Sequence, residues 1–279
     1  MKIKKVIKDY VLKEVLEHLS ELEAELIAGG TDLMVKIREE KNEKEVLIDI
    51  SDVKELKNIE ILDDFIRIGS CVKFTDIVEN DYIKENYFGL YKAVKSVGSP
   101  QIRNLGTIGG NIANGSPAAD SVPPLLVLNA RVILESKNGK RVKMLKDLYI
   151  DKGNVDIKDD EILTYIEFDK IVGKIGFEKL GLRNALAISR ISTSVYIELM
   201  DEKISTIRVA SGSLGLYPIR EFSLEEFMIG NTLTDEFINK SAEKYCEIID
   251  ERLKGRSTLE FKREAIKGMF VKCIKDLIS

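Results

Sequence analysis

The segment that decides the fold reads TIGGNIANGSPAAD and covers residues 107–120. It holds three glycines, two asparagines and one proline. Glycine weakens both helices and strands, and Pro117 interrupts both. We therefore expect neither a regular helix nor a regular strand here, although the segment is apolar enough to be buried. Such a segment is typical of a loop that lets a ligand approach the backbone.

A second segment of the same character reads IAGGTD and covers residues 27–32. Each segment joins a Gly-Gly pair to small hydroxyl or amide residues. Successive backbone N–H groups in such loops form a nest for an anion, and the first loop also leads into a helix start that favours phosphate. Two nests from separate units could hold the two phosphates of a dinucleotide, with side-chain hydrogen bonds from Thr31, Thr107 and Asn111.

The spacing matches neither common nucleotide-binding fingerprint, because the chain contains no G-x-G-x-x-G and no G-x-x-x-x-G-K-[ST]. The residues alone therefore leave a plainer interpretation open, in which both segments are tight turns. At the end of the second segment, Asp120 carries a carboxylate that can accept a hydrogen bond from a ribose or ribityl hydroxyl.

The charge balance points away from two classes of partner. The 279 residues include 43 basic and 47 acidic side chains, a formal net charge of −4. This balance favours neither a nucleic acid nor a membrane surface as a partner. No apolar run approaches a membrane span, and the N-terminus lacks the apolar core of a signal peptide. We therefore expect a cytoplasmic protein.

Histidine and cysteine limit the chemistry further. The single histidine, His18, falls inside a helical pattern, so a catalytic triad or a His-rich metal site would have to use that one residue. Cys71, Cys246 and Cys273 lack the spacing of a zinc or iron–sulfur site and are expected to be buried free thiols. If the protein is an enzyme, a cofactor is expected to supply the difficult chemistry.

The pattern of apolar residues divides the chain into three units. Residues 1–52 and 53–170 each mix short helices with strands, which is typical of α/β units. Residues 171–279 begin with an antiparallel meander and end in helices, which indicates an α+β unit with its helices packed on one face of the sheet.

The two glycine segments resemble those of a known family, the FAD-binding medium subunits of the molybdenum hydroxylases, which include carbon monoxide dehydrogenase and xanthine dehydrogenase. The resemblance rests on IAGGTDLMVKIRE and RNLGTIGGNIANGSPAADSVPPLLVLNARV, and continues through FEKLGLRNALAIS and GSLGLYPIR, so that it covers nearly the whole chain. It implies an α+β protein, with two α/β subdomains of a PCMH-type FAD-binding domain followed by a C-terminal α+β domain of the carbon monoxide dehydrogenase flavoprotein type.

The resemblance also implies a set of cofactor-binding residues. Two loops would hold the pyrophosphate of FAD, namely Leu26, Ile27, Ala28, Gly29, Gly30, Thr31, Asp32 and Leu33 in the first and Thr107, Ile108, Gly109, Gly110 and Asn111 in the second. The pair Thr31-Asp32 varies from the Gln-Ser or Asn-Thr that the family often has there. Asp120 would meet a hydroxyl of FAD, and Leu163 and Lys179 would lie at the flavin or near it.

Lys179 has a chemical argument of its own. A cation near N1 and the C2 carbonyl of a flavin stabilises the anionic reduced ring and raises its reduction potential. The alternative is a solvated lysine at the end of a strand.

By resemblance, the chain is an electron-transfer subunit of an oxidoreductase complex. FAD would receive single electrons from iron–sulfur clusters in a small subunit, fed by a molybdenum-cofactor large subunit, and deliver a pair to NAD or another acceptor. The scattered cysteines disfavour a cluster in this chain. Two alternatives stay open, a non-catalytic flavin-binding scaffold subunit and a stand-alone FAD oxidoreductase.

Overall fold

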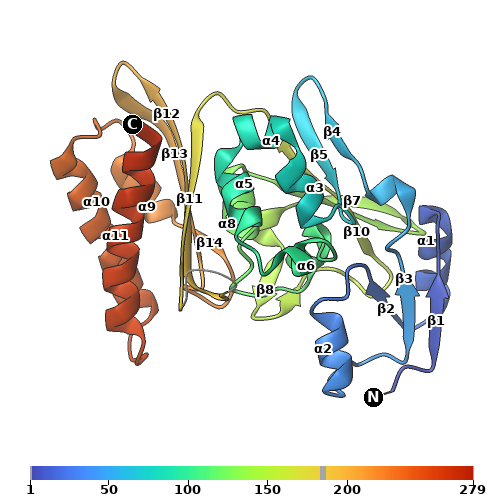
Figure 1. The fold of residues 1–279 in the computed structure, drawn as a ribbon. Helices are drawn as coiled ribbons and strands as arrows, with labels where there is room; N and C mark the ends of the chain where they lie inside the picture. Colours follow the sequence, from blue (N-terminus) through green and yellow to red (C-terminus); the bar gives the residue numbers. More distant parts are fainter. Residues whose placement is uncertain (1, 183–186, 279) are drawn as a thin grey trace.

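The computed structural model describes residues 2–182 and 187–278. Three units stand side by side, each with its own main sheet (Figure 1). The first unit carries the N-terminus, the second lies in the middle, and the third carries the C-terminus on the opposite side (Figure 1). The mixture of helices and strands confirms the expected α+β class.

The first unit is a parallel sheet of three strands in the order β1-β3-β2. Parallel neighbours need crossover connections, and the two helices of this unit supply them. Val15 and Leu19, four residues apart, are the buried face of α1. The elements are β1 (Lys5–Lys8), α1 (Leu12–Glu21), β2 (Ala24–Ile27), α2 (Leu33–Arg38) and β3 (Val46–Asp49).

The second unit has an antiparallel sheet in the order β4-β5-β10-β6-β7. Its helices pack between this sheet and the sheet of the third unit (Figure 1). One large apolar core contains residues of these helices and of both sheets. The elements are η1 (Lys54–Leu56), β4 (Ile59–Ile61), β5 (Phe65–Gly69), α3 (Phe74–Glu79), α4 (Asp81–Asn86), α5 (Phe88–Lys95), α6 (Pro100–Arg103), α7 (Ile108–Ala113), α8 (Val122–Val127), β6 (Arg131–Ser136), β7 (Gly139–Met144), η2 (Leu145–Asp147), β8 (Tyr149–Asp151), β9 (Asn154–Val155) and β10 (Ile162–Asp169).

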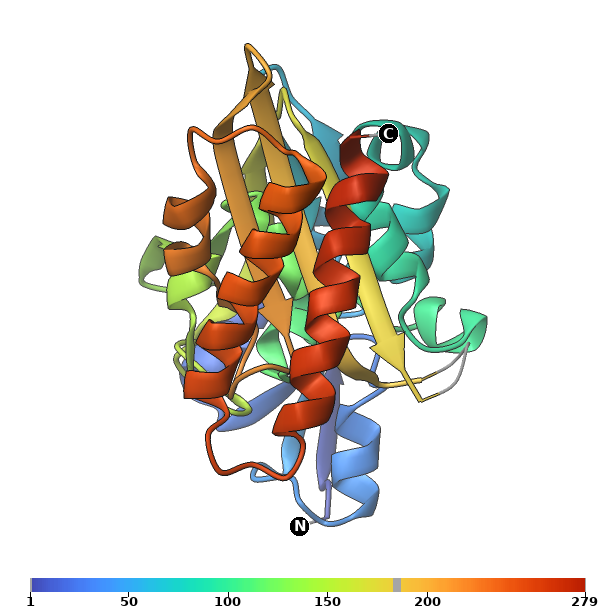
Figure 2. The same ribbon diagram turned by 90° about the vertical axis from the view of Figure 1, so that its left-hand side faces the viewer.

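The third unit is the antiparallel meander followed by helices that the sequence predicts. Two long helices, α10 and α11, cover the outer face of its sheet (Figure 2). The inner face meets α5 and α8 of the second unit. The elements are β11 (Lys174–Gly181), β12 (Ser189–Met200), β13 (Lys203–Gly212), β14 (Ile219–Arg220), α9 (Phe222–Met228), α10 (Asp235–Arg252) and α11 (Leu259–Ile278).

The expectation that residues 107–120 form no regular helix is wrong for their first half, which is α7. Tertiary contacts override the weak helix propensity of the two glycines. The N–H groups of Ile108 and Gly109 donate to the carbonyls of Val72 and Ser70. A Cβ on Gly109 would come within 2.7 Å of the Ser70 carbonyl oxygen, so the helix packs this closely only with glycine there. The second half is irregular, as expected.

His18 and the three cysteines have the structural roles that the sequence predicts for them. His18 Nδ1 lies 2.9 Å from Asp9 Oδ2 and ties α1 to the end of β1. The three cysteines are free and buried. Within residues 2–182 and 187–278, no helix has the length and apolar character needed to cross a membrane.

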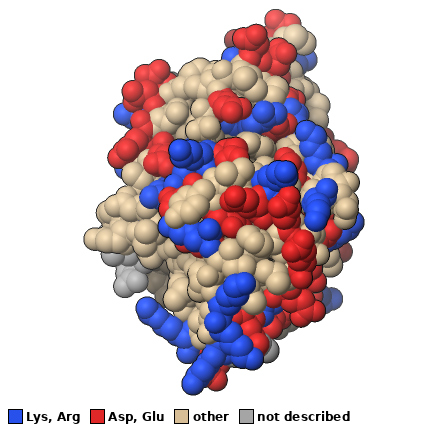
Figure 3. Space-filling view, turned by 90° about the vertical axis from the view of Figure 1, so that its right-hand side faces the viewer, with Lys and Arg blue, Asp and Glu red and all other residues tan. Residues whose placement is uncertain are grey.

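Basic and acidic side chains are interspersed on the face of the first unit shown in Figure 3. Lys8 and Lys57 both lie within 3 Å of Asp52, at 2.7 and 2.9 Å. Hydrogen bonds from these lysines lower the pKa of the Asp52 carboxyl to about 2. Such exposed pairs contribute little to stability.

The contact between α7 and Ser70 yields a paired prediction. Gly109→Ala should lower the free energy of unfolding by about 1–3 kcal/mol, because its methyl group overlaps Ser70. Gly268→Ala is the matched control, since α11 leaves open space at that position; it should stabilise the chain by about 0.4–1 kcal/mol. Urea unfolding of both variants measures the difference, and equal effects would contradict the close contact.

Candidate functional site

A cavity of about 300 Å³ lies between the first and second units and contains both glycine loops. The first unit supplies the end of β2, the loop after it and the start of α2. The second unit supplies residues of α3, α6 and α7 and of the segments between them. The residues that line the cavity are Glu25, Leu26, Ile27, Ala28, Gly29, Gly30, Thr31, Asp32, Leu33, Lys36, Phe74, Val97, Ile102, Gly106, Thr107, Gly110, Asn111, Ala113 and Asn114.

The first wall is built by backbone. All eight residues from Leu26 to Leu33 that the resemblance assigns to the cofactor line the cavity. A Cβ on Gly29 would overlap the carbonyl oxygen of Leu105 and lie 2.6 Å from its carbonyl carbon. The first loop therefore lies directly against the backbone of the segment before α7, with no side chain between them. Glycine permits this approach.

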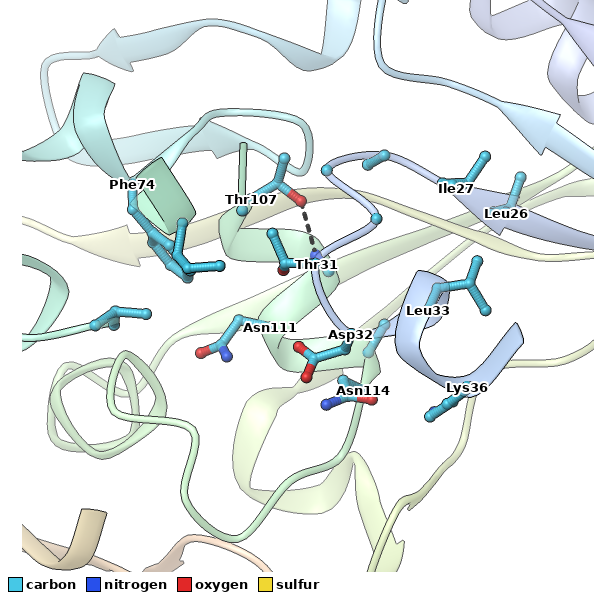
Figure 4. Close-up of a pocket in the computed structure, with 18 of the residues that line it drawn as sticks. Leu26, Ile27, Thr31, Asp32, Leu33, Lys36, Phe74, Thr107, Asn111 and Asn114 are labelled. Carbon is cyan, nitrogen blue, oxygen red and sulfur yellow. Dashed lines mark hydrogen bonds between the residues drawn. The ribbon is translucent and has the colours of Figure 1, made fainter. Parts of the chain in front are cut away.

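The second wall is one face of α7. Thr107, Gly110, Asn111 and Asn114 follow one another at helical spacing and all line the cavity. Thr107 is the N-cap, and its Oγ1 accepts a hydrogen bond of 3.2 Å from the Gly110 N–H (Figure 4). An accepting hydroxyl keeps its own proton, which stays free to be donated to a ligand.

Polar side chains from the two walls face each other. In Figure 4 the carboxylate of Asp32 points across the cavity towards the side-chain amides of Asn111 and Asn114. The Asn111 Oδ1 accepts a hydrogen bond of 2.7 Å from Ser121 Oγ. The cavity thus offers amide and hydroxyl donors on one wall and a carboxylate acceptor on the other.

An apolar wall and a pair of opposite charges complete the lining. Phe74, Val97 and Ile102 supply carbon surface from the second unit. From the first unit, Glu25 and Lys36 bring an acid and a base. The Glu25 Oε2 is buried without a hydrogen-bond partner in the described structure. Burial raises the pKa of this carboxyl, and the nearby Lys36 and Lys44 oppose the shift.

Five residues assigned by resemblance do not line this cavity. Ile108 and Gly109 are on α7 but face the core, and Leu163 is buried in β10. Asp120 and Lys179 lie behind the cavity, between the second and third units. The structure therefore gathers the whole first loop and Thr107, Gly110 and Asn111 of the second into one cavity, and leaves the other five assigned positions outside its lining.

Asp120 and Lys179 form a buried ion pair. Lys179 Nζ lies 2.6 Å from Asp120 Oδ2 and also donates to the Ser96 carbonyl at 2.9 Å. Ser189 Oγ donates to Asp120 Oδ1. Burial raises the pKa of Asp120, and Lys179 and Ser189 act against that shift. The alternative of a solvated lysine is wrong, because the Lys179 side chain is only 13% exposed.

Neighbours of this ion pair belong to the cavity. Ser96, which accepts from Lys179, precedes the cavity residue Val97, and Ser121, which follows Asp120, contacts Asn111. The ion pair is thus linked to the cavity wall in two ways: Lys179 binds Ser96, the neighbour of Val97, and Asp120 precedes Ser121, which binds Asn111.

Sequence reasoning missed several lining residues. The signal for Asn114 and Lys36 was available, since they lie three and four residues after Asn111 and Asp32 on their helices. Reading 107–113 as a helix would have found Asn114. Glu25, Phe74, Val97 and Ile102 carry no local signal, because their position depends on how the two units meet.

Glu25 gives a pH-dependent prediction. Because the folded chain raises the pKa of this carboxyl, its ionised form is disfavoured in the fold, and wild-type stability falls as the pH rises through that pKa. Glu25→Gln removes this loss. In FAD-free protein, the variant should have a higher Tm than wild type at pH 8, and the difference should shrink at pH 4. Thermal unfolding at both pH values measures it, and a difference independent of pH would contradict the buried carboxylate.

Comparison with known proteins places this cavity in a family. Residues 4–169 match the family described as the FAD binding domain in molybdopterin dehydrogenase. Residues 177–277 match the CO dehydrogenase flavoprotein C-terminal domain. Together the two matches span nearly the entire chain, and the first contains both walls of the cavity.

Whole-length relatives agree with these matches. The nicotinate dehydrogenase FAD-subunit of Eubacterium barkeri is 34% identical over 272 residues, which cover 95% of this chain and 92% of that protein. The xanthine dehydrogenase FAD-binding subunit of Escherichia coli O157:H7 is 30% identical over 262 residues, which cover 92% of this chain and 89% of that protein.

A solved structure has the same fold. A chain of carbon monoxide dehydrogenase from Hydrogenophaga pseudoflava aligns with a TM-score of 0.92 at 22% identity, covering 99% of this chain and 97% of that one. The resemblance inferred from the two glycine loops is confirmed. The chain belongs to the FAD-binding medium subunits of the molybdenum hydroxylases, a family of oxidoreductases with FAD as the cofactor of this subunit.

Proposed function

We propose that the chain is the electron-transfer subunit of a heteromeric molybdenum hydroxylase complex. Its partners are an iron–sulfur small subunit and a molybdenum-cofactor large subunit, and its electron acceptor is NAD or another small oxidant. We expect this complex in the cytoplasm. The name of one relative, the carbon monoxide dehydrogenase medium chain of Hydrogenophaga pseudoflava, marks it as one chain of a larger assembly.

The observation that carries the proposal is the cavity between the two glycine loops. Its donors are the Thr107 hydroxyl and the amides of Asn111 and Asn114, beside closely apposed glycine backbones. These groups fit a diphosphate, which offers only acceptors. Asp32 fits a hydroxyl of the adjoining ribose or ribityl chain instead, since a carboxylate repels phosphate and accepts from a hydroxyl.

The ends of an extended dinucleotide are assigned by position. With its diphosphate at the loops, we expect one end against β2 and α2, which line the cavity, and the other towards β10 and β11, which lie outside the lining. We place the adenosine at the first end, near Glu25 and Lys36. We place the flavin at the second, near Leu163, Asp120 and Lys179. This side of the second unit is covered by the third unit.

FAD suits such a subunit because, once bound, it accepts electrons singly and releases them as a pair. The chain's own residues bind it, exclude water from the apolar wall and hold charged groups in fixed positions. This task needs no nucleophile and no proton-shuttling histidine, which agrees with the engagement of His18 by Asp9.

Gly110→Leu tests the cavity directly. A leucine at this exposed position would bring its Cβ within 2.9 Å of Thr107 Oγ1, so it would crowd that hydroxyl and fill the cavity beside it without entering the core. We expect wild type to bind FAD and the variant to bind at least about 10-fold more weakly, with a far-UV melting curve close to that of wild type. FAD titration by flavin fluorescence quenching measures the affinity. Gly268→Leu places the same side chain on α11, in open space, and should leave FAD binding unchanged.

The electron acceptor is tested on the FAD-loaded chain. Anaerobic addition of NADH should bleach the visible absorbance of the flavin if NAD is the acceptor. A chain that binds FAD but is not reduced by NADH or by any dithionite-reduced dye would favour the scaffold alternative. A chain that turns over a substrate by itself would favour the stand-alone enzyme. Failure of wild type to bind FAD at all would contradict the proposed function.

A further inference from the structure

Ser121 is fully buried and does not line the cavity, yet it contacts a residue that does. Its hydroxyl donates a hydrogen bond of 2.7 Å to Asn111 Oδ1. We propose that Ser121 is a positioning residue, which turns the donor end of the Asn111 amide towards the diphosphate of the bound cofactor. The inference rests on the proposed function and adds a residue to it.

The argument begins with the two ends of an amide. Asn111 has an acceptor oxygen and a nitrogen with two N–H donors. A half turn about the last side-chain bond exchanges them at little steric cost, because they are nearly the same size. Next to a diphosphate the exchange matters, since the nitrogen donates to the anion and the oxygen repels it. In the structure Ser121 donates to the oxygen, which leaves the N–H groups of the nitrogen for the cavity. Because a serine hydroxyl can also accept, Ser121 and the anion select this orientation together: Ser121 takes the oxygen and the diphosphate takes the nitrogen.

The position of Ser121 is fixed from the third unit. The residue before it, Asp120, is held by Lys179 of β11 and Ser189 of β12. The helix after it, α8, is held at its other end, where Arg220 Nη1 donates to the Leu126 carbonyl at 3.2 Å. Ser121 is therefore anchored on both sides by the C-terminal unit, and its contact with Asn111 extends that anchoring to the cavity wall.

A different role would be that Ser121 only fills space at the start of α8. The two roles predict different coupling between Ser121 and Asn111. If Ser121 acts through the amide, removing its hydroxyl has no further effect once the amide is absent. If it only fills space, the effects of the two substitutions multiply.

The experiment is a double-mutant cycle on the full-length chain, read out as the Kd for FAD. Ser121→Ala should weaken binding about 3- to 10-fold, and Asn111→Ala at least about 10-fold, the ranges for one hydrogen bond to a neutral and to a charged partner. The double variant should bind within about 2-fold of Asn111→Ala alone. Ser192→Ala is the matched control, because Ser192 is a fully buried serine of the third unit whose hydroxyl has no partner in the described structure; it should leave the Kd unchanged.

A second measurement needs no flavin. In ¹⁵N-labelled FAD-free protein, the side-chain amide signals of Asn111 are identified by their loss in Asn111→Ala. They should shift between wild type and Ser121→Ala, and inorganic pyrophosphate should move them in wild type more than in Ser121→Ala.

Two results would overturn the inference. One is a double variant in which the losses of the single variants multiply. The other is a set of Asn111 amide signals that Ser121→Ala leaves unchanged. If wild type binds no FAD, the proposed function fails, while the amide signals still decide whether Ser121 orients Asn111.

Discussion

The cavity depends on one close contact, between the first glycine loop and the backbone before α7. Gly29 lies against Leu105 so closely that a methyl group would overlap its carbonyl. A backbone carbonyl cannot rotate away as a side chain can, so this contact sets the distance between the walls. Across that distance Asp32 faces Asn111 and Asn114. The first and second units have separate sheets, and they form one site because Gly29, which has no side chain, lies where they touch.

The third unit shapes this site from behind. Among the described residues, the cavity lining comes from the first two units. Yet Asp120, buried at 5% exposure, receives both of its partners from β11 and β12. A buried carboxylate that lost such partners would be strongly destabilising, by about 3–5 kcal/mol. Because separating these charges is costly, the third unit stays fixed against the segment that carries Ser121. Ser121 in turn donates a hydrogen bond to Asn111.

Sequence reasoning predicted features that depend on neighbouring residues and missed features that depend on contacts between distant ones. Gly29 and Gly110 were found because glycine pairs beside small polar residues indicate close approach of a ligand, and the meander of the third unit was found from its alternation. The helix α7 was missed because its stability comes from hydrogen bonds to Val72 and Ser70, which lie 36 and 39 residues before their partners Ile108 and Gly109. That error also concealed Asn114, which shares a helix face with Asn111.

The pairing of Asp120 with Lys179 was beyond sequence reasoning for a related reason. The two residues are 59 positions apart. Their opposite charges show that they would attract each other, but the sequence does not show that the fold brings them together. Each was assigned separately to a cofactor atom. In the structure each satisfies the other, so neither is expected to act on a flavin as an isolated charge.

This pairing changes what Lys179 can do to a flavin. A lone buried ammonium acts as a net positive charge, whose potential falls slowly with distance in a medium of low dielectric. With Asp120 at 2.6 Å, the two charges form a dipole, whose potential falls faster and depends on its orientation. A ring on the lysine side of the pair would still meet the positive end, but with Asp120 reducing the effect. In return, the position of the ammonium is fixed by Asp120 and the Ser96 carbonyl. A smaller field that is already held in place would suit the electron-transfer role proposed above, since the lysine would then need no reorganisation during transfer.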